Sequence, residues 1–279
     1  MAEEIINNGS FIQSVIEQQL NEDILEFEEE KLDFNPLKVY FGDDYILNDR
    51  ITIHQPSIQD FIEFGEENIN RVVAPFSANT TAYRVQLWDI DIDWNKITNM
   101  DLINLLFKTI DFEYSKLIFG DINFNTFNIY EKTYNGETTS VLYSEEADIE
   151  IDEKTLSKMC KYIQYMFATH PPEEEFVSNK TLKQELINND RQKQLKWKKE
   201  NRNQNMLSMI SSCLNHPGFK YKKNELRNVG IFEFMDSVQR LQIYEQTHSL
   251  LLGRFNGLCD LSKVNKDEFN FMRDIRVTA

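Results

Sequence analysis

Three aspartates at alternate positions, Asp89, Asp91 and Asp93, form the best carboxylate cluster in the sequence. On an extended strand this spacing places them on one face, where a hard cation such as Mg²⁺ or Ca²⁺ could bind. A calcium loop is excluded, because Trp94 stands at the required glycine and Met100 at the bidentate glutamate. The same alternation is typical of a half-exposed strand, with the apolar residues between the aspartates facing inward. We favour that interpretation and predict no metal at this cluster.

Other patterns that carry chemistry are missing from the sequence. The 4 histidines and 3 cysteines form no His-x-x-x-His or Cys-x-x-Cys pair, and the glycines form no phosphate-binding loop. Ser57 lies at a strand-to-helix junction but lacks the flanking glycines of a nucleophile elbow. We therefore predict a protein that is not an enzyme, with no catalytic, cofactor-binding or metal-binding residues and no cofactor. A metal-dependent enzyme using the three aspartates is the third functional hypothesis.

Hydrophobic periodicity predicts an α+β fold in three parts. An acidic helical arm covers residues 1–35, with its helix at 5–27. A small, mostly antiparallel β-sheet with helices covers 36–172, and an all-helical module follows at 173–279. The module boundary is placed at Pro172, because the two-residue periodicity typical of strands stops there.

Within these parts, turn and cap residues mark the predicted elements. The strands are three short segments in 37–53, one at 84–94, and a hairpin around Asn135-Gly136 within 117–151. Ser57, Thr98 and Asp152 are predicted helix N-caps. The clearest helix spans 225–252 with Gly253 as its C-terminal cap, and a last short helix spans 265–275.

Charge limits the possible partners. The net charge of −16 argues against general nucleic-acid binding, which needs clustered Lys and Arg. Residues 1–36 carry ten acids and one base, whereas 180–202 carry eight bases and three acids. Such runs are typical of solvated faces, and the alternative interpretation is two complementary surfaces, within one chain or between neighbouring chains. The odd, scattered cysteines favour a reducing compartment, and neither a secretory signal nor a membrane span is predicted.

The 225–252 helix is apolar over a wide face. Two interpretations are open: it is the buried central helix of its module, or part of its surface is a groove for an apolar partner segment. In the second case Phe232, Met235 and Tyr244 are the predicted partner-binding residues, since Met and aromatic side chains suit adaptable contacts.

Two stretches of the chain resemble a known group of proteins. They are YILNDRITIHQPSIQDFIEFGEENI at 45–69 and LRNVGIFEFMDSVQRLQIYEQTHSLLLGRFNGLCDLSKVNKDEFNFMRDI at 226–275. Both are similar to proteins that long-tailed phages of Gram-positive bacteria encode between the tail-tube and tape-measure genes, which are interpreted as tail assembly chaperones. The α+β middle part departs from the better-known, small and mostly helical members.

The resemblance implies a non-enzymatic protein of the host cytoplasm that keeps an apolar tape-measure chain soluble during tail assembly. Its implied partners are tape-measure or other tail proteins, with self-association possible and neither nucleic acid nor membrane expected. The alternative is a permanent structural component of the virion, such as a connector or tail protein.

Overall fold

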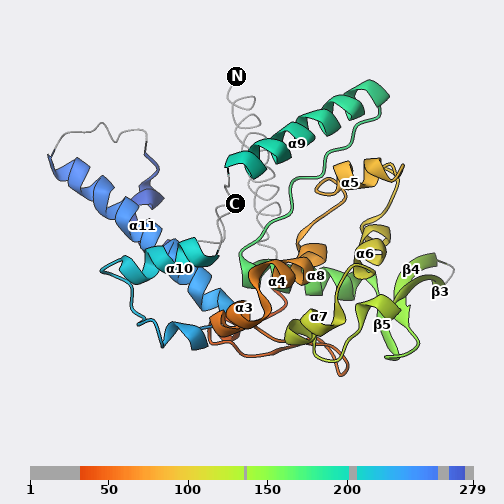
Figure 1. Cartoon of the computed structure of the whole chain (residues 1–279), viewed down its shortest axis with the longest axis horizontal. Helices are drawn as coiled ribbons and strands as arrows, with labels where there is room; N and C mark the ends of the chain where they lie inside the picture. The colour runs from red at the N-terminus through yellow and green to blue at the C-terminus, as the bar shows by residue number, and fades with distance from the viewer. Residues whose placement is uncertain (1–31, 135–136, 201–205, 257–263, 274–279) are drawn as a thin grey trace, which may run out of the picture. The chain divides into compact units, whose positions relative to one another are not determined.

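The computed structural model describes residues 32–134, 137–200, 206–256 and 264–273 (Figure 1). The chain divides into two compact units, residues 1–35 and 36–279, and every element named below belongs to the second unit. Helices together with small antiparallel sheets confirm the predicted α+β class. The predicted helix at 5–27 lies outside the described residues.

The second unit begins with short elements and ends with long helices. Up to residue 126 the elements are α2 (Pro36–Tyr40), β1 (Tyr45–Ile46), β2 (Thr52–Ile53), α3 (Ile58–Phe64), α4 (Glu66–Val73), η1 (Ala74–Ser77), α5 (Arg84–Asp89), α6 (Asn99–Phe107), α7 (Phe112–Phe119) and η2 (Phe124–Thr126). The later elements are β3 (Asn128–Tyr134), β4 (Glu137–Ser144), β5 (Ile149–Ile151), α8 (Glu153–Phe167), α9 (Lys180–Glu200), α10 (Met206–Asn215), η3 (Leu226–Asn228), α11 (Ile231–Asn256) and η4 (Lys266–Phe269).

Two small antiparallel sheets supply all the named strands. β1 pairs with β2, and the second sheet has the order β3-β4-β5. The β3–β4 hairpin keeps one register from Asn128↔Tyr143 to Tyr134↔Glu137, whereas β5 pairs only with the last three residues of β4. The hairpin prediction is confirmed, although its turn residues 135–136 lie outside the described residues.

Phenylalanine rings form the centre of the core. Five fully or almost fully buried rings from η1, α6, α7 and the segment before β3 contact one another: Phe76, Phe107, Phe119, Phe124 and Phe127. Ring centroids lie 4.5 Å apart for Phe107–Phe124 and 4.9 Å apart for Phe76–Phe119. Tilted and edge-to-face packing of this kind adds to the free energy of burying the rings.

Four of the predicted elements were wrong. Residues 36–40 form helix α2, and 84–89 form helix α5 followed by turns, where strands were expected. Gly253 lies inside α11, which continues to Asn256, and residues 266–269 form only the 3-10 turn η4. An alternating pattern of so few residues occurs in strands and also in short helices followed by turns. Whether such a segment becomes a strand depends on hydrogen bonding to a neighbouring strand.

The helix that follows the β1–β2 hairpin begins where its sequence predicts. Ser57 is the N-cap of α3: its hydroxyl accepts from the Asp60 N–H, and the Asp60 carboxylate accepts from the Ser57 N–H, which completes a capping box. We expect Ser57→Ala to lower the free energy of unfolding by about 0.5–2 kcal/mol, as typical for a lost N-cap. Urea denaturation measures the change, and a midpoint equal to that of the parent protein would contradict it.

The two stretches that carry the phage resemblance meet at the start of α11. The Ile231 N–H donates to the Pro56 carbonyl at 2.8 Å, and the Ile58 N–H donates to the Val229 carbonyl at 3.0 Å. Gln55 closes the junction by donating to the Val39 carbonyl and accepting from the Phe232 N–H. An added Cβ at Gly230 would lie 2.0 Å from the Gln55 Oε1, so a larger residue would displace the Gln55 side chain from this junction.

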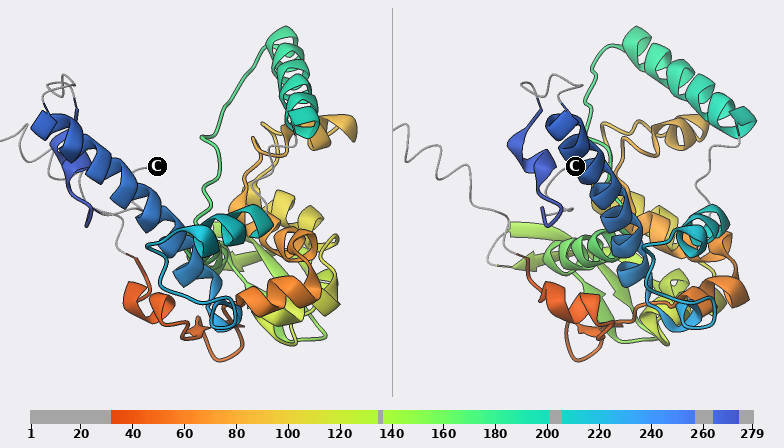
Figure 2. Two further views of the ribbon diagram at one scale, coloured as in Figure 1. Left: turned by 60° about the vertical axis from the view of Figure 1, so that its left-hand side comes forward. Right: turned by 90° about the vertical axis from the view of Figure 1, so that its left-hand side faces the viewer.

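A long extended segment connects α8 to α9. Residues 171–179 have no helix or strand, and α9 packs beside α5 (Figures 1 and 2). The first turns of α11 pack against α8 and α2. Residues 173–279 thus make several contacts with 36–172 inside the second unit, and the separable helical module beyond Pro172 stays a prediction.

Candidate functional site

The three aspartates of the predicted cluster do not share a strand face. Asp89 ends α5, Asp91 has a left-handed backbone with φ of 61°, and Asp93 lies in the turn that follows. The predicted inward orientation of the apolar residues is only partly correct, since Trp94 is buried but Ile90 is exposed. The segment folds back on itself, because the Ile92 N–H donates to the Leu87 carbonyl at 2.9 Å.

Two of these aspartates form ion pairs with α9. Lys183 is buried and its Nζ lies 2.6 Å from Asp93 Oδ2, while the Arg191 guanidinium pairs with Asp89. Burial acts to raise the pKa of Asp93, but the hydrogen bonds from Lys183 and the Asn95 N–H outweigh it and lower the pKa. Part of the basic 180–202 stretch therefore neutralises the acidic segment of the same chain.

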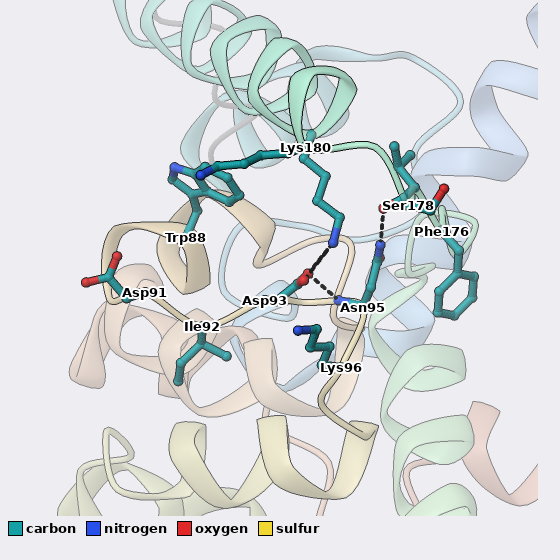
Figure 3. A pocket seen from close by; sticks show the side chains of 11 residues that line it. Trp88, Asp91, Ile92, Asp93, Asn95, Lys96, Phe176, Ser178 and Lys180 are labelled. Carbon is teal, nitrogen blue, oxygen red and sulfur yellow. Dashed lines mark hydrogen bonds and ion pairs between the residues drawn. The ribbon is translucent and has the colours of Figure 1, made fainter.

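A pocket of about 830 Å³ opens beside these ion pairs (Figure 3). We call it the α5–α9 pocket, and its lining residues come from the turn after α5, from the extended segment and from the start of α9: Trp88, Asp91, Ile92, Asp93, Asn95, Lys96, Phe176, Val177, Ser178, Lys180 and Lys183. Figure 3 shows Asn95 directed at the extended segment, where it donates to the Val177 carbonyl. The Lys183 ammonium donates to the Asp93 carboxylate. None of the lining residues is a histidine or a cysteine.

We expect no stoichiometric binding of Mg²⁺, Mn²⁺ or Ca²⁺ at Asp89, Asp91 and Asp93. The carboxylates of Asp89 and Asp93 already face cationic side chains, and the described residues contain no group of His, Cys, Asp and Glu arranged to hold a metal. Titration calorimetry of the protein and of Asp91→Ala with each cation is the measurement. A tight site that disappears in Asp91→Ala would contradict this prediction and favour the metal-dependent enzyme.

The predicted partner-binding residues of α11 have three different environments. Phe232 is only 3% exposed and packs between Tyr40 and Tyr165, with ring centroids 6.1 and 5.1 Å away. Met235 is half-buried, and Tyr244 is exposed and stacks on His248. Tyr244 is the most exposed of the three, whereas Phe232 belongs to the core.

Large exposed apolar side chains lie on the second half of α11 and on residues 264–273. We call this set the α11 apolar surface: Tyr244, Leu252, Phe255, Phe271 and Met272. Phe255 is 82% exposed and Met272 72% exposed. Tyr244 and Phe255 lie on one face, since the positions are about three helical turns apart at 3.6 residues per turn. The sequence pattern does not indicate Phe255, because it predicts that the helix ends at Gly253, whereas α11 continues to Asn256.

Polar contacts hold residues 264–273 along α11. The buried Thr247 hydroxyl donates to the Glu268 carbonyl at 3.0 Å, and Arg240 donates to the Arg273 carbonyl at 2.7 Å. Arg273 in turn pairs with Glu268 at 3.0 Å. These contacts fix the main chain of the segment, while Phe271 and Met272 stay exposed.

Two pockets flank Leu241 in the middle of α11. One, of about 360 Å³, lies between α10 and α11 and is lined by Met209, Cys213, His216 and Val238 among others. The other, of about 420 Å³, is lined by four aromatic residues together with the charged residues of its rim: Tyr40, Phe219, Tyr244 and Phe271, with Lys220, Asp236 and Arg240. Apolar hollows beside an amphipathic helix are suited to side chains of a partner helix or strand.

Burial disfavours the thiolate form of the two described cysteines. Burial raises the pKa of Cys160 to about 12 and also raises the pKa of Cys213. A catalytic thiol needs the opposite shift, toward the thiolate. Cys259 lies outside the described residues.

Comparison of the chain with models of protein families, with curated proteins and with solved structures finds no match. In the described ranges, no helix combines the length and the apolar character needed to cross a bilayer.

Proposed function

We propose that this protein is a non-enzymatic assembly chaperone or scaffold of phage tail assembly, which holds an apolar tape-measure-type partner soluble in the host cytoplasm. The observation that carries the proposal is the α11 apolar surface, whose large side chains remain open on a chain with a net charge of −16. Exposed apolar patches on soluble proteins mark interaction sites, and the acidic remainder keeps such a protein dispersed.

The sequence resemblance suggests the class of partner, a tape-measure-type tail protein. One resembling stretch, 226–275, contains α11 and the residues packed along it, and the other, 45–69, contacts the first turn of α11. The proposed contact is an apolar segment of the tape-measure chain lying along α11, with side chains entering the pockets beside Leu241. Nucleic acid is not a proposed partner.

Co-expression with the tape-measure protein tests the proposal. We expect the protein to raise the soluble fraction of that partner, and Leu252→Ser with Phe255→Ser to abolish most of the gain without unfolding the chaperone. The matched control is Ile62→Ser with Ile90→Ser, which removes two other exposed apolar side chains, from α3 and the turn after α5. Equal solubilisation by both double variants would place the binding surface elsewhere.

Mass spectrometry of purified particles separates the proposed role from its alternative. A chaperone acts during assembly and is absent from the finished virion, whereas a connector or tail protein is present in stoichiometric amount. Detection of the chain in mature particles would overturn the chaperone role in favour of a permanent virion component.

A further inference from the structure

The extended segment before α9 is bound by side chains as a peptide ligand would be. We call residues 172–177 the strap. Its main chain is held at three positions: Asn79 Nδ2 donates to the Pro172 carbonyl at 2.6 Å, and Asn95 Nδ2 donates to the Val177 carbonyl at 2.6 Å. At Glu175 the N–H donates to the Thr81 hydroxyl at 3.0 Å, and the carbonyl accepts from the Trp94 indole at 3.3 Å.

One carboxylate of the strap is recognised by a buried arginine. Arg84 Nη1 donates to Glu175 Oε2 at 2.6 Å, and Arg84 Nε donates to Asp190 of α9 at 2.5 Å. The hydrogen bond to Asp190 raises the pKa of Arg84, and the bond to Glu175 acts in the same direction. Arg84 therefore stays cationic and faces the strap.

Burial is unequal across this contact. Four of the five residues that hold the strap are buried, namely Asn79, Thr81, Trp94 and Arg84, which is 7% exposed, while Asn95 is half-buried. The strap is exposed from Pro172 to Phe176, and the Phe176 ring is 68% exposed. Its attachment thus depends on hydrogen bonds and one ion pair, with little apolar area removed from water.

This asymmetry defines what could replace the strap. Because the strap buries little apolar area, it can open by local unfolding while the rest of the fold stays intact. Opening leaves the buried groups that hold it without partners, and a second segment that offers the same hydrogen bonds and the same carboxylate removes that penalty. A suitable segment is extended and carries a carboxylate at the position of Glu175. The preceding carboxylate, that of Glu174, makes one exposed contact, accepting from Asn99 Nδ2 at 3.1 Å.

We propose that Asn79, Thr81, Arg84, Trp94 and Asn95 form a binding site for an extended acidic segment of a partner protein, and that the strap is its intramolecular occupant. The adjoining α5–α9 pocket extends the site, because Lys96 and Lys180 line it where the chain leaves Val177. Acidic residues that follow the anchoring carboxylate of the partner would meet these lysines. The site does not involve the α11 apolar surface.

Binding of a peptide in trans to the full-length protein tests the proposal. The probe is a fluorescein-labelled peptide of residues 170–179, HPPEEEFVSN, followed by fluorescence anisotropy. A tethered segment competes at an effective concentration on the order of millimolar, so the parent protein should bind the probe weakly. Glu175→Gln in the protein weakens the occupant, and we expect it to bind the probe about tenfold more tightly.

Two controls make the result specific. Glu173→Gln in the protein should leave the affinity at the parent value, because none of the binding-site residues contacts that carboxylate in the described part of the chain. The peptide with Glu175→Gln should lose about tenfold in affinity for the Glu175→Gln protein. Equal affinity of the parent and Glu175→Gln proteins for the unmodified probe would overturn the proposal.

Hydrogen exchange of the parent protein gives a second measurement that does not depend on a variant. Excess unlabelled peptide should accelerate exchange in residues 172–177 and leave α8 and β5 unchanged. Saturating binding without faster exchange in the strap would overturn the proposal by placing the peptide elsewhere. Dimeric elution of Glu175→Gln in size-exclusion chromatography would identify a second copy as the occupant and overturn the assignment to a partner.

Discussion

Replacing Phe232 by alanine is expected to lower the free energy of unfolding by about 3–5 kcal/mol, the range for truncating a buried aromatic side chain. The ring is buried at the first turn of α11, stacked on Tyr165 and edge-to-face with Tyr40. Its loss leaves a cavity where α11 packs against α8 and α2. Urea denaturation followed by circular dichroism measures the change.

Phe255→Ala is the matched control on the same helix. The Phe255 ring is exposed, and surface truncations usually change stability by no more than about 0.5 kcal/mol. Similar losses for the two variants would contradict the assignment of Phe232 to the core. Comparing the stabilities of the two variants also shows which residues can be substituted to test partner binding. A variant that unfolds loses binding whether or not the substituted residue contacts the partner.

Replacing Arg84 by methionine should cost about 2–4 kcal/mol. Hydrogen bonds to charged groups contribute about 1.5–3 kcal/mol each, and the two carboxylates bound by Arg84 are partly solvated, which reduces the sum. Glu175 is about half exposed and Asp190 mostly buried, so the loss falls mainly on the contact with α9. Methionine replaces the aliphatic part of the arginine side chain and removes the guanidinium group with its charge.

Arg50→Met provides the comparison for an exposed pair. Arg50 lies 3.6 Å from Asp148 with both side chains exposed, and such surface pairs contribute about 0–1 kcal/mol. Hydrogen exchange should accelerate in α9 and in residues 172–177 for Arg84→Met alone. Matching stabilities and exchange rates for the two variants would show that Arg84 does not hold α9 and the strap in place.

Capping residues in the sequence determined where three of the helices begin. Ser57, Thr98 and Asp152 each accept a hydrogen bond at the start of the predicted helix, because capping involves atoms only a few residues apart. The Asn-Gly hairpin and the α+β class follow from equally local patterns. The acidic character of the chain is likewise fixed by composition.

The tertiary structure alone decided what each polar or apolar side chain faces. From the sequence, Asp93 can be interpreted as a metal ligand or as a solvated residue. The structure shows that it faces Lys183, which lies ninety positions later in the chain. Phe232 and Phe255 are indistinguishable in a helical pattern, yet one is buried against α8 and the other is open. The binding of the strap by Asn79 and Arg84 also joins positions about ninety residues apart. Such contacts depend on how distant elements pack, and a periodic pattern records only the neighbours along one helix or strand.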